Sequence, residues 1–241
     1  MTAWLDPTIL ALGLAVGVGA FVQSSIGFGI AVVSAPFVVL VEPQLMPVSL
    51  MVCAVFLPVV QLITGPREVS WTPLGWSLVA RIMATPLGVA IVAATSADAI
   101  ALLVGVLILI TVAVSMRSVD IRPTRGSMIA AGAISGVSGT AASIGGPFMA
   151  LAMQHEPPHR LRATLAVFFI IGTSFSLVAL AVAGQLTAEQ LRAGITWWPF
   201  VVAGHVAAGP VRARLHPAAL RRAVLAFCVV ASVGVIARTL L

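Results

Sequence analysis

Residues 8–41 form one apolar stretch, TILALGLAVGVGAFVQSSIGFGIAVVSAPFVVLV, which is broken near its middle by the polar and glycine-rich segment Gln23–Gly29. A helix needs about 20 apolar residues to cross a bilayer, so this stretch is longer than one straight span requires. Backbone that leaves the helical path inside a membrane must be buried in protein or line a polar cavity, because lipid offers its N–H and C=O groups no partners. The stretch therefore predicts a broken spanning helix or a re-entrant helical hairpin.

The composition extends this membrane interpretation to the whole chain. Of its 241 residues, 60% are hydrophobic and 8% are charged, whereas a soluble domain carries about 25% charged residues. We expect an all-α integral membrane protein without a soluble domain. Its apolar stretches are 8–41, 46–64, 73–94, 99–117, 126–153, 163–183, 195–211 and 218–237.

The stretch 126–153 repeats the design of the first one. It is interrupted at Ser138–Pro147, and both interruptions contain Ser-Ile-Gly, at 25–27 and 143–145. Further features recur in the same order: Glu42-Pro43 and Glu156-Pro157, Ser49 and Thr164, and Arg81 before Pro86 and His205 before Pro210. These correspondences predict a duplicated unit of about 120 residues, with one membrane repeat in 1–120 and a second in 121–241.

The arginines favour opposite orientations for the two repeats. If all eight stretches cross, six arginines fall on each side, against the tendency of basic residues to gather on the cytoplasmic side. If 8–41 and 126–153 are hairpins, ten arginines share the cytoplasmic side and only Arg192 and Arg238 lie outside. We therefore expect inverted repeats, each a re-entrant or broken hairpin plus three transmembrane helices, a recurrent plan of transporters.

The two interruptions are the predicted binding site. Glycine lets backbone bend and approach a ligand, and a helix that begins after the bend directs free N–H groups and its positive dipole end at the cavity. That arrangement suits an anion, although small residues can also serve close helix packing. The candidate residues are Gln23, Ser24, Ser25, Gly27, Ser138, Thr140, Ser143 and Gly145.

Two basic residues inside spans complete the candidate site. A charged side chain in the middle of a span is costly, so Arg81 is predicted to contact substrate or line a cavity, rather than to extend to the interface. His205 occupies the equivalent place in the second half and is predicted to bind an anion or relay a proton, or else to serve as a structural hydrogen bonder. Cys53 and Cys228 have no partner spacing and are expected to be buried thiols.

Three glycine-containing segments carry a resemblance to a known family: Ser25–Gly29, Ile134–Gly139 and Ile144–Phe148. With the duplicated architecture and the length of the chain, they resemble the TauE/SafE family of sulfite exporter-like permeases. The resemblance extends over essentially the whole chain. It implies movement of sulfite, sulfonates such as sulfoacetate, or related oxyanions across the bacterial cytoplasmic (inner) membrane.

The functional expectation is a secondary anion carrier that works by alternating access, with its site between the two hairpin tips. The expected partners are a small anion and the lipid bilayer, and not nucleic acid; no cofactor or metal is expected, while proton or ion coupling and a homodimer stay open. A passive anion channel is one alternative. The other is a rhomboid-like serine protease, because Gly136–Gly139 has a Gly-x-Ser-Gly pattern and His205 could act as the base. Four tryptophans near span ends are expected to be interfacial anchors: Trp71, Trp76, Trp197 and Trp198.

Overall fold

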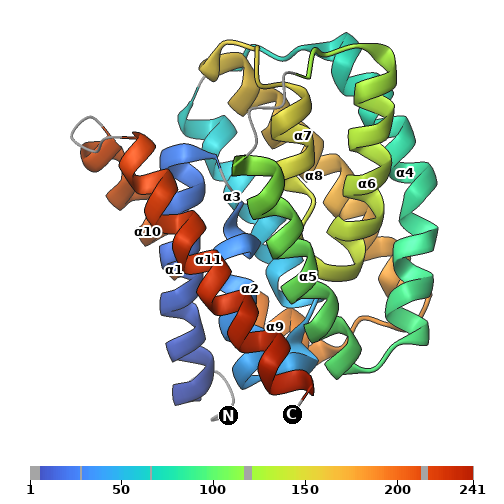
Figure 1. Ribbon diagram of the computed structural model, residues 1–241, viewed down its shortest axis with the longest axis vertical. Coiled ribbons are helices and arrows are strands. Elements are labelled where there is room, and N and C mark those ends of the chain that lie inside the picture. Colours follow the sequence, from blue (N-terminus) through green and yellow to red (C-terminus); the bar gives the residue numbers. More distant parts are fainter. Residues whose placement is uncertain (1–5, 28, 66, 117–120, 213–216, 241) are drawn as a thin grey trace.

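The computed structural model describes residues 6–27, 29–65, 67–116, 121–212 and 217–240. Within these ranges every regular element is helical (Figure 1). The elements are α1 (Pro7–Ile26), α2 (Ile30–Val41), η1 (Pro43–Leu45), α3 (Val48–Thr64), α4 (Trp71–Ala94), α5 (Ala97–Met116), α6 (Arg125–Ala142), α7 (Gly146–Ala152), α8 (Pro158–Val182), α9 (Ala188–Thr196), α10 (Trp198–Arg212) and α11 (Pro217–Leu240).

Five of the described helices are long and apolar enough to cross a membrane. They are α1, α4, α5, α8 and the part of α11 from Ala219 to Leu240, while α2 and α3 are shorter apolar helices. Their length and composition confirm the prediction of an all-α, multi-pass membrane protein. The predicted apolar stretches match these elements closely, with 8–41 divided into α1 and α2 and 126–153 divided into α6 and α7.

Helices α1 and α2 form a helical hairpin, called hairpin 1. Gly19 of α1 lies against Ile30 of α2, and Ser34 Oγ of α2 donates to the carbonyl of Ala15 at 3.2 Å, so α2 runs back along α1. The missing side chain at Gly19 lets the two backbones approach closely. Both ends of hairpin 1 lie at the same end of the bundle, beside α9.

Helices α6 and α7 form hairpin 2, which opens in the other direction. Gln154 and His155 follow α7, and both bond to the carbonyl of Ile121, which precedes α6, at 3.4 and 3.1 Å. The two ends of hairpin 2 therefore lie together. They lie at the end of the bundle opposite to the N- and C-termini, whereas hairpin 1 opens beside the termini (Figure 1).

The last turns of α3, α5, α7 and α10 and the first turns of α4, α6, α8 and α11 share one end of the bundle, which we call the arginine-rich end (Figure 1). Contacts between these segments include Glu68 with Arg160 at 3.7 Å and Arg221 with the carbonyl of Ser115 at 2.6 Å. The opposite end holds Arg192 on α9 and Arg238, which bonds to the carbonyl of Leu40. Arg117 and Arg214, which also entered the arginine count, lie outside the described residues.

Each hairpin packs against a helix from the other half of the chain. In the pair α1–α10, Gly204 lies against the backbone of Gly17; in the pair α4–α6, Gly136 lies against the backbone of Arg81. Both pairs are parallel, and they occupy opposite flanks of the bundle (Figure 1). Glycine at these crossings allows backbone contact, which is a common way for helices to associate in membranes.

The segment after α8 differs from the prediction of a single helix over 195–211. Helix α9 ends at Thr196 and α10 begins at Trp198, because Pro199 has no N–H to continue the helical ladder. The prediction that Trp197 is an interfacial anchor was wrong: its side chain is fully buried, and its Nε1 donates to the carbonyl of Ile9 at 2.8 Å. Trp71 is 68% exposed, as an anchor would be.

Candidate functional site

Hairpin 1 turns through two glycines with positive φ. Gly27 ends α1 in the left-handed region at φ 75°, and its N–H bonds to the carbonyl of Gln23 at 2.9 Å. Gly29 precedes α2 at φ 107° and provides no side-chain cap for the N–H groups of that helix. A residue with a side chain would be strained at either position, so these glycines permit the turn. Phe28, between them, lies outside the described residues.

Hairpin 2 has a tip that is held together by serine hydroxyls. Ser135 Oγ donates to the carbonyl of Gly145 at 2.6 Å, and Ser138 Oγ donates to the carbonyl of Ile144 at 2.7 Å. Ser143 ends α6 in the left-handed region at φ 62°, a conformation that is uncommon for a residue other than glycine. Its Oγ donates to the carbonyl of Pro47 at 2.7 Å, which ties this tip to the start of α3.

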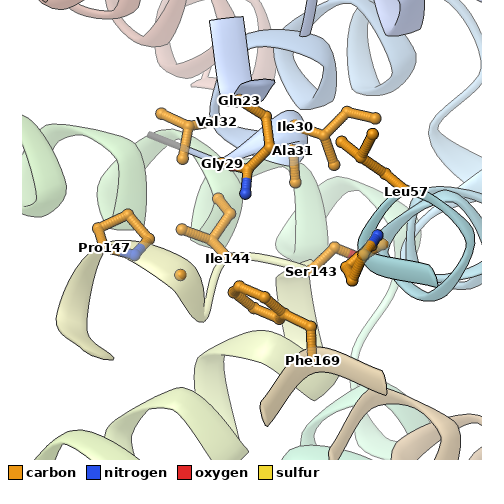
Figure 2. Close-up of a pocket in the computed structure, with 13 residues that line it drawn as sticks. Gln23, Gly29, Ile30, Ala31, Val32, Leu57, Ser143, Ile144, Pro147 and Phe169 are labelled. Carbon is orange, nitrogen blue, oxygen red and sulfur yellow. The ribbon is translucent and has the colours of Figure 1, made fainter. Parts of the chain in front are cut away.

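The two tips, far apart in the sequence, meet across one small cavity, which we call the tip cavity (Figure 2). Its volume is about 30 Å³, enough to hold a water molecule. Hairpin 1 supplies one side of it, hairpin 2 and α8 supply the other, and α3 adds residues such as Leu57 (Figure 2). The lining residues are Gln23, Gly29, Ile30, Ala31, Val32, Ala54, Leu57, Pro58, Ser143, Ile144, Gly146, Pro147 and Phe169.

Several polar groups of hairpin 1 are buried here without a partner in the described structure. The side chain of Gln23 extends from α1 into the tip cavity, and its Oε1 has no hydrogen-bond partner (Figure 2). The Ser25 hydroxyl, on the last turn of α1 but not part of the cavity lining, is also buried and unpaired. The first residues of α2, Gly29 to Val32, line the cavity, and no side chain caps their N–H groups. A helix N-terminus of this kind binds an anion through its free N–H groups and its dipole.

Arg81 lies outside the tip cavity, in a closed compartment between α4, α6 and α8. Its side chain is 1% exposed, and its Nη2 donates to Thr173 Oγ1 at 2.8 Å. The guanidinium carbon lies 4.5 Å from the ring centroid of Phe168 and 5.7 Å from that of Phe169. Its Nε and Nη1 have no hydrogen-bond partner, and Arg81 forms no ion pair within the described parts of the chain. Thr140, another predicted site residue, bonds to Ser176 Oγ at 2.8 Å.

His205 lies in a second and larger cavity at the arginine-rich end, which we call the vestibule. Its Nδ1 bonds to Ser24 Oγ at 2.9 Å and its Nε2 to Thr64 Oγ1 at 3.2 Å. The cavity has a volume of about 290 Å³ and receives the side chain of Arg162. Its described lining contains no acidic residue: Ser24, Gln61, Leu62, Thr64, Gly65, Arg162, Ala163, Ala166, His205, Val206 and Gly209.

The predicted site residues therefore fall into three neighbouring groups. Gln23 and Ser143 line the tip cavity, and Gly27 and Gly145 shape the two turns beside it. Ser24 and His205 lie in the vestibule, while Arg81 and Thr140 lie in separate buried contacts with α8.

Two residues of these cavities were missed by the sequence reasoning. Phe169 lines the tip cavity and also stacks on Arg81. It lies in an apolar run where nothing distinguishes one phenylalanine from another. Arg162, in the vestibule, entered the sequence analysis only through the arginine count that favoured hairpins. No sequence pattern separates a topology signal from a place in a cavity.

An all-helical, multi-pass bundle with two helical hairpins whose tips meet at a buried junction is an architecture used by membrane transporters. The family model described as Sulfite exporter TauE/SafE matches residues 10–235, and the chain belongs to this family of membrane transporters. This confirms the resemblance noted in the sequence. Neither the curated proteins nor the solved structures gave a significant match.

The contacts of Ser138 bear on the protease alternative. Its hydroxyl donates to the backbone carbonyls of Ile134 and Ile144, at 2.8 and 2.7 Å. His205 bonds instead to Ser24 and Thr64, on other helices. A Ser–His dyad needs the two side chains within hydrogen-bond reach of each other. These contacts, like the family membership, favour a transporter over a protease.

Proposed function

We propose that this protein is a secondary carrier of small oxyanions, most simply sulfite or organosulfonates such as sulfoacetate. The transported anion binds between the tips of hairpins 1 and 2. The observation that carries the proposal is the tip cavity: two glycine-containing tips from different halves of the chain converge there on unpaired polar groups. The name of the family supports a sulfur oxyanion as the substrate.

Hydrogen-bond donors around the tip cavity suit a compact anion. The start of α2 contributes backbone N–H groups and the positive end of a helix dipole, and the Gln23 carboxamide can turn its NH₂ group toward the ligand. At the end of α1, the Ser25 hydroxyl has no hydrogen-bond partner and is a further donor. Oxyanions accept several hydrogen bonds at once, and donors without other partners gain most from such a ligand.

The small volume of the tip cavity favours a carrier over an open channel. Its volume of about 30 Å³ leaves no wide pore between the described parts of the two tips, so passage of an oxyanion requires the tips to move apart. A carrier that alternates between two open conformations passes through such a closed junction. A passive channel needs a continuous path, which the closed tips interrupt.

The opposite directions of the hairpins support alternating access through two inverted repeats, in 1–120 and 121–241. Hairpin 1 opens at the end with the termini and hairpin 2 at the arginine-rich end (Figure 1). By the positive-inside tendency, the arginine-rich end faces the cytoplasm of a bacterial inner membrane. Rocking of one repeat against the other would then expose the site first to one side and then to the other.

The test is anion binding by the detergent-purified protein, measured as thermal stabilisation by sulfite, sulfoacetate, carboxylates and phosphate. We expect stabilisation by a sulfur oxyanion, and saturable uptake of the same anion by proteoliposomes. Gln23→Leu should weaken binding about 10- to 150-fold, the effect of losing one hydrogen bond to a charged group. Gln44→Leu, at an exposed position within η1, is the matched control and should bind normally. A folded protein that responds to no anion would refute the substrate class, and unchanged binding by Gln23→Leu would refute the site.

A further inference from the structure

Arg81 and His205 make matching contacts in the two halves of the chain. Arg81, on α4 of the first half, bonds to Thr173 on α8 and lies beside Gly139 near the end of α6, both in the second half. His205, on α10 of the second half, contacts two helices of the first half. It bonds to the last turn of α1 and to the last residue of α3, both in the first half. Each basic residue therefore contacts the long hairpin helix of the opposite half and the helix that follows that hairpin.

The surroundings of these two residues differ in how open they are. His205 lies in the vestibule, a cavity of about 290 Å³ at the arginine-rich end. Arg81 lies in a compartment that leaves 1% of its side chain exposed. If the halves are repeats, equivalent positions that differ in this way indicate one open half-site and one closed half-site.

The positive charge of the Arg81 guanidinium is buried without an opposite charge from the described residues. Two of the three guanidinium nitrogens have no hydrogen-bond partner, and the described residues provide no carboxylate to pair with it. A buried charge in this condition is costly, and in a membrane protein it marks a place where an ion binds or passes. An oxyanion would supply both the missing acceptors and the opposite charge.

Phe169 separates this compartment from the tip cavity. Its ring lines the cavity, and its centroid lies 5.7 Å from the guanidinium carbon of Arg81. On the far side of Arg81, Thr140 and Ser176 form a fully buried hydroxyl pair. Ser176 lies one turn beyond Thr173 on α8, toward the end that holds the termini. Polar groups thus continue from the tip cavity past Phe169 and Arg81 toward that end.

We propose that the Arg81 compartment is a second oxyanion half-site, the counterpart of the vestibule, which opens toward the end with the termini when the vestibule closes. This inference rests on the proposed function. The same small sulfonate or sulfite that occupies the tip cavity would reach Arg81 after the Phe169 ring moves aside. His205 and Arg162 serve the anion on the arginine-rich side, and Arg81 serves it on the other.

The test combines a wedge in the vestibule with a thiol in the closed compartment. Gly209 lines the vestibule, and a Cβ at this position would meet no atom within 4 Å, so Gly209→Trp should fold and hold the vestibule open. Gly234 on α11 has equally open surroundings outside the vestibule, which makes Gly234→Trp the matched control. Ser176→Cys introduces a thiol of similar size one turn from Thr173, the hydrogen-bond partner of Arg81. The native Cys53 and Cys228 are buried, and the wild-type chain measures their background reaction.

The Ser176→Cys protein is placed in proteoliposomes, and a membrane-impermeant thiol reagent is added on the side of the termini. We expect sulfoacetate to raise labelling of the thiol at position 176 about tenfold. Sulfoacetate is the probe because sulfite itself consumes thiol reagents. Gly209→Trp should abolish both this labelling and transport, and Gly234→Trp should preserve both. If Ser176→Cys fails to fold, Thr140→Cys provides the same readout from α6.

Two outcomes overturn the inference and leave the proposed function intact. In the first outcome, the Ser176→Cys protein transports the anion in a saturable, Gln23-dependent way, but its thiol at position 176 is never labelled or is labelled from the arginine-rich side. The other is normal transport by Gly209→Trp. Absence of any anion transport or binding in the folded wild-type protein would instead refute the proposed function itself.

Discussion

Replacing Arg81 with methionine should leave the protein about as stable as the wild type while abolishing anion transport. Burial of an ion costs several kcal/mol even after the protein relaxes around it. Against this cost stand the hydrogen bond to Thr173, worth about 1.5–3 kcal/mol, and the contacts with the rings of Phe168 and Phe169, worth about 2 kcal/mol. These contributions nearly cancel, and methionine fills a similar volume.

Thermal unfolding of the detergent-purified Arg81→Met variant measures the net contribution of Arg81 to the stability of the protein. We expect the Tm to fall by no more than about 4 °C, or to rise, because 1 kcal/mol corresponds to about 2–4 °C in a chain of this size. An arginine held by structural pairing would cost about 3–5 kcal/mol when removed, or about 6–20 °C. A fall of that size would show that Arg81 is structural, and normal sulfoacetate flux in a stable variant would remove it from the transport path. Arg192→Met, at an exposed position, is the control and should change neither quantity.

Three further substitutions separate packing from surface effects. Gly136→Val should prevent folding, seen as loss of the monodisperse detergent-solubilised protein, because its side chain would collide with the backbone of Arg81. Trp197→Phe should lower the Tm by about 1–6 °C, since it removes one buried hydrogen bond to Ile9 worth about 0.5–1.5 kcal/mol; an unchanged Tm would argue against that contact. Glu68→Gln should alter stability by less than about 1 kcal/mol in chemical denaturation, because its ion pairs are exposed, and a larger loss would contradict this.

Much of the architecture could be predicted from local sequence, because lipid requires long apolar helices and allows few exceptions. The two glycine- and serine-containing interruptions could be located for the same reason, and the arginine count favoured hairpins that open in opposite directions. The division between α9 and α10 was missed, although Pro199 provided a signal for it. The short amphipathic helix at Ala188–Thr196 was not predicted, because most of it lies in the polar segment between two apolar stretches.

The arrangement of the candidate site was less predictable. Arg81 and His205 were expected to serve one site together, whereas the structure places them in separate surroundings, on helices that pack against opposite hairpins. Spacing along the chain predicted equivalent positions for the two residues, but it could not predict which helices face them. Phe169 could not be found at all, because its role depends on a contact with Arg81, a residue 88 positions away in the sequence.

Each hairpin packs against a helix from the other half of the chain, and this pairing has a consequence for the synthesis of the protein. Gly17 on α1 packs against Gly204 on α10, and 187 residues of chain separate them. At about 5–20 residues per second, a ribosome needs roughly 10–40 s to make that length. During this interval α1 is inserted without its partner, with its glycines facing lipid or the insertion machinery. A chain that stops after the first half would leave α1 and α4 permanently unpaired, and membrane quality control should remove it.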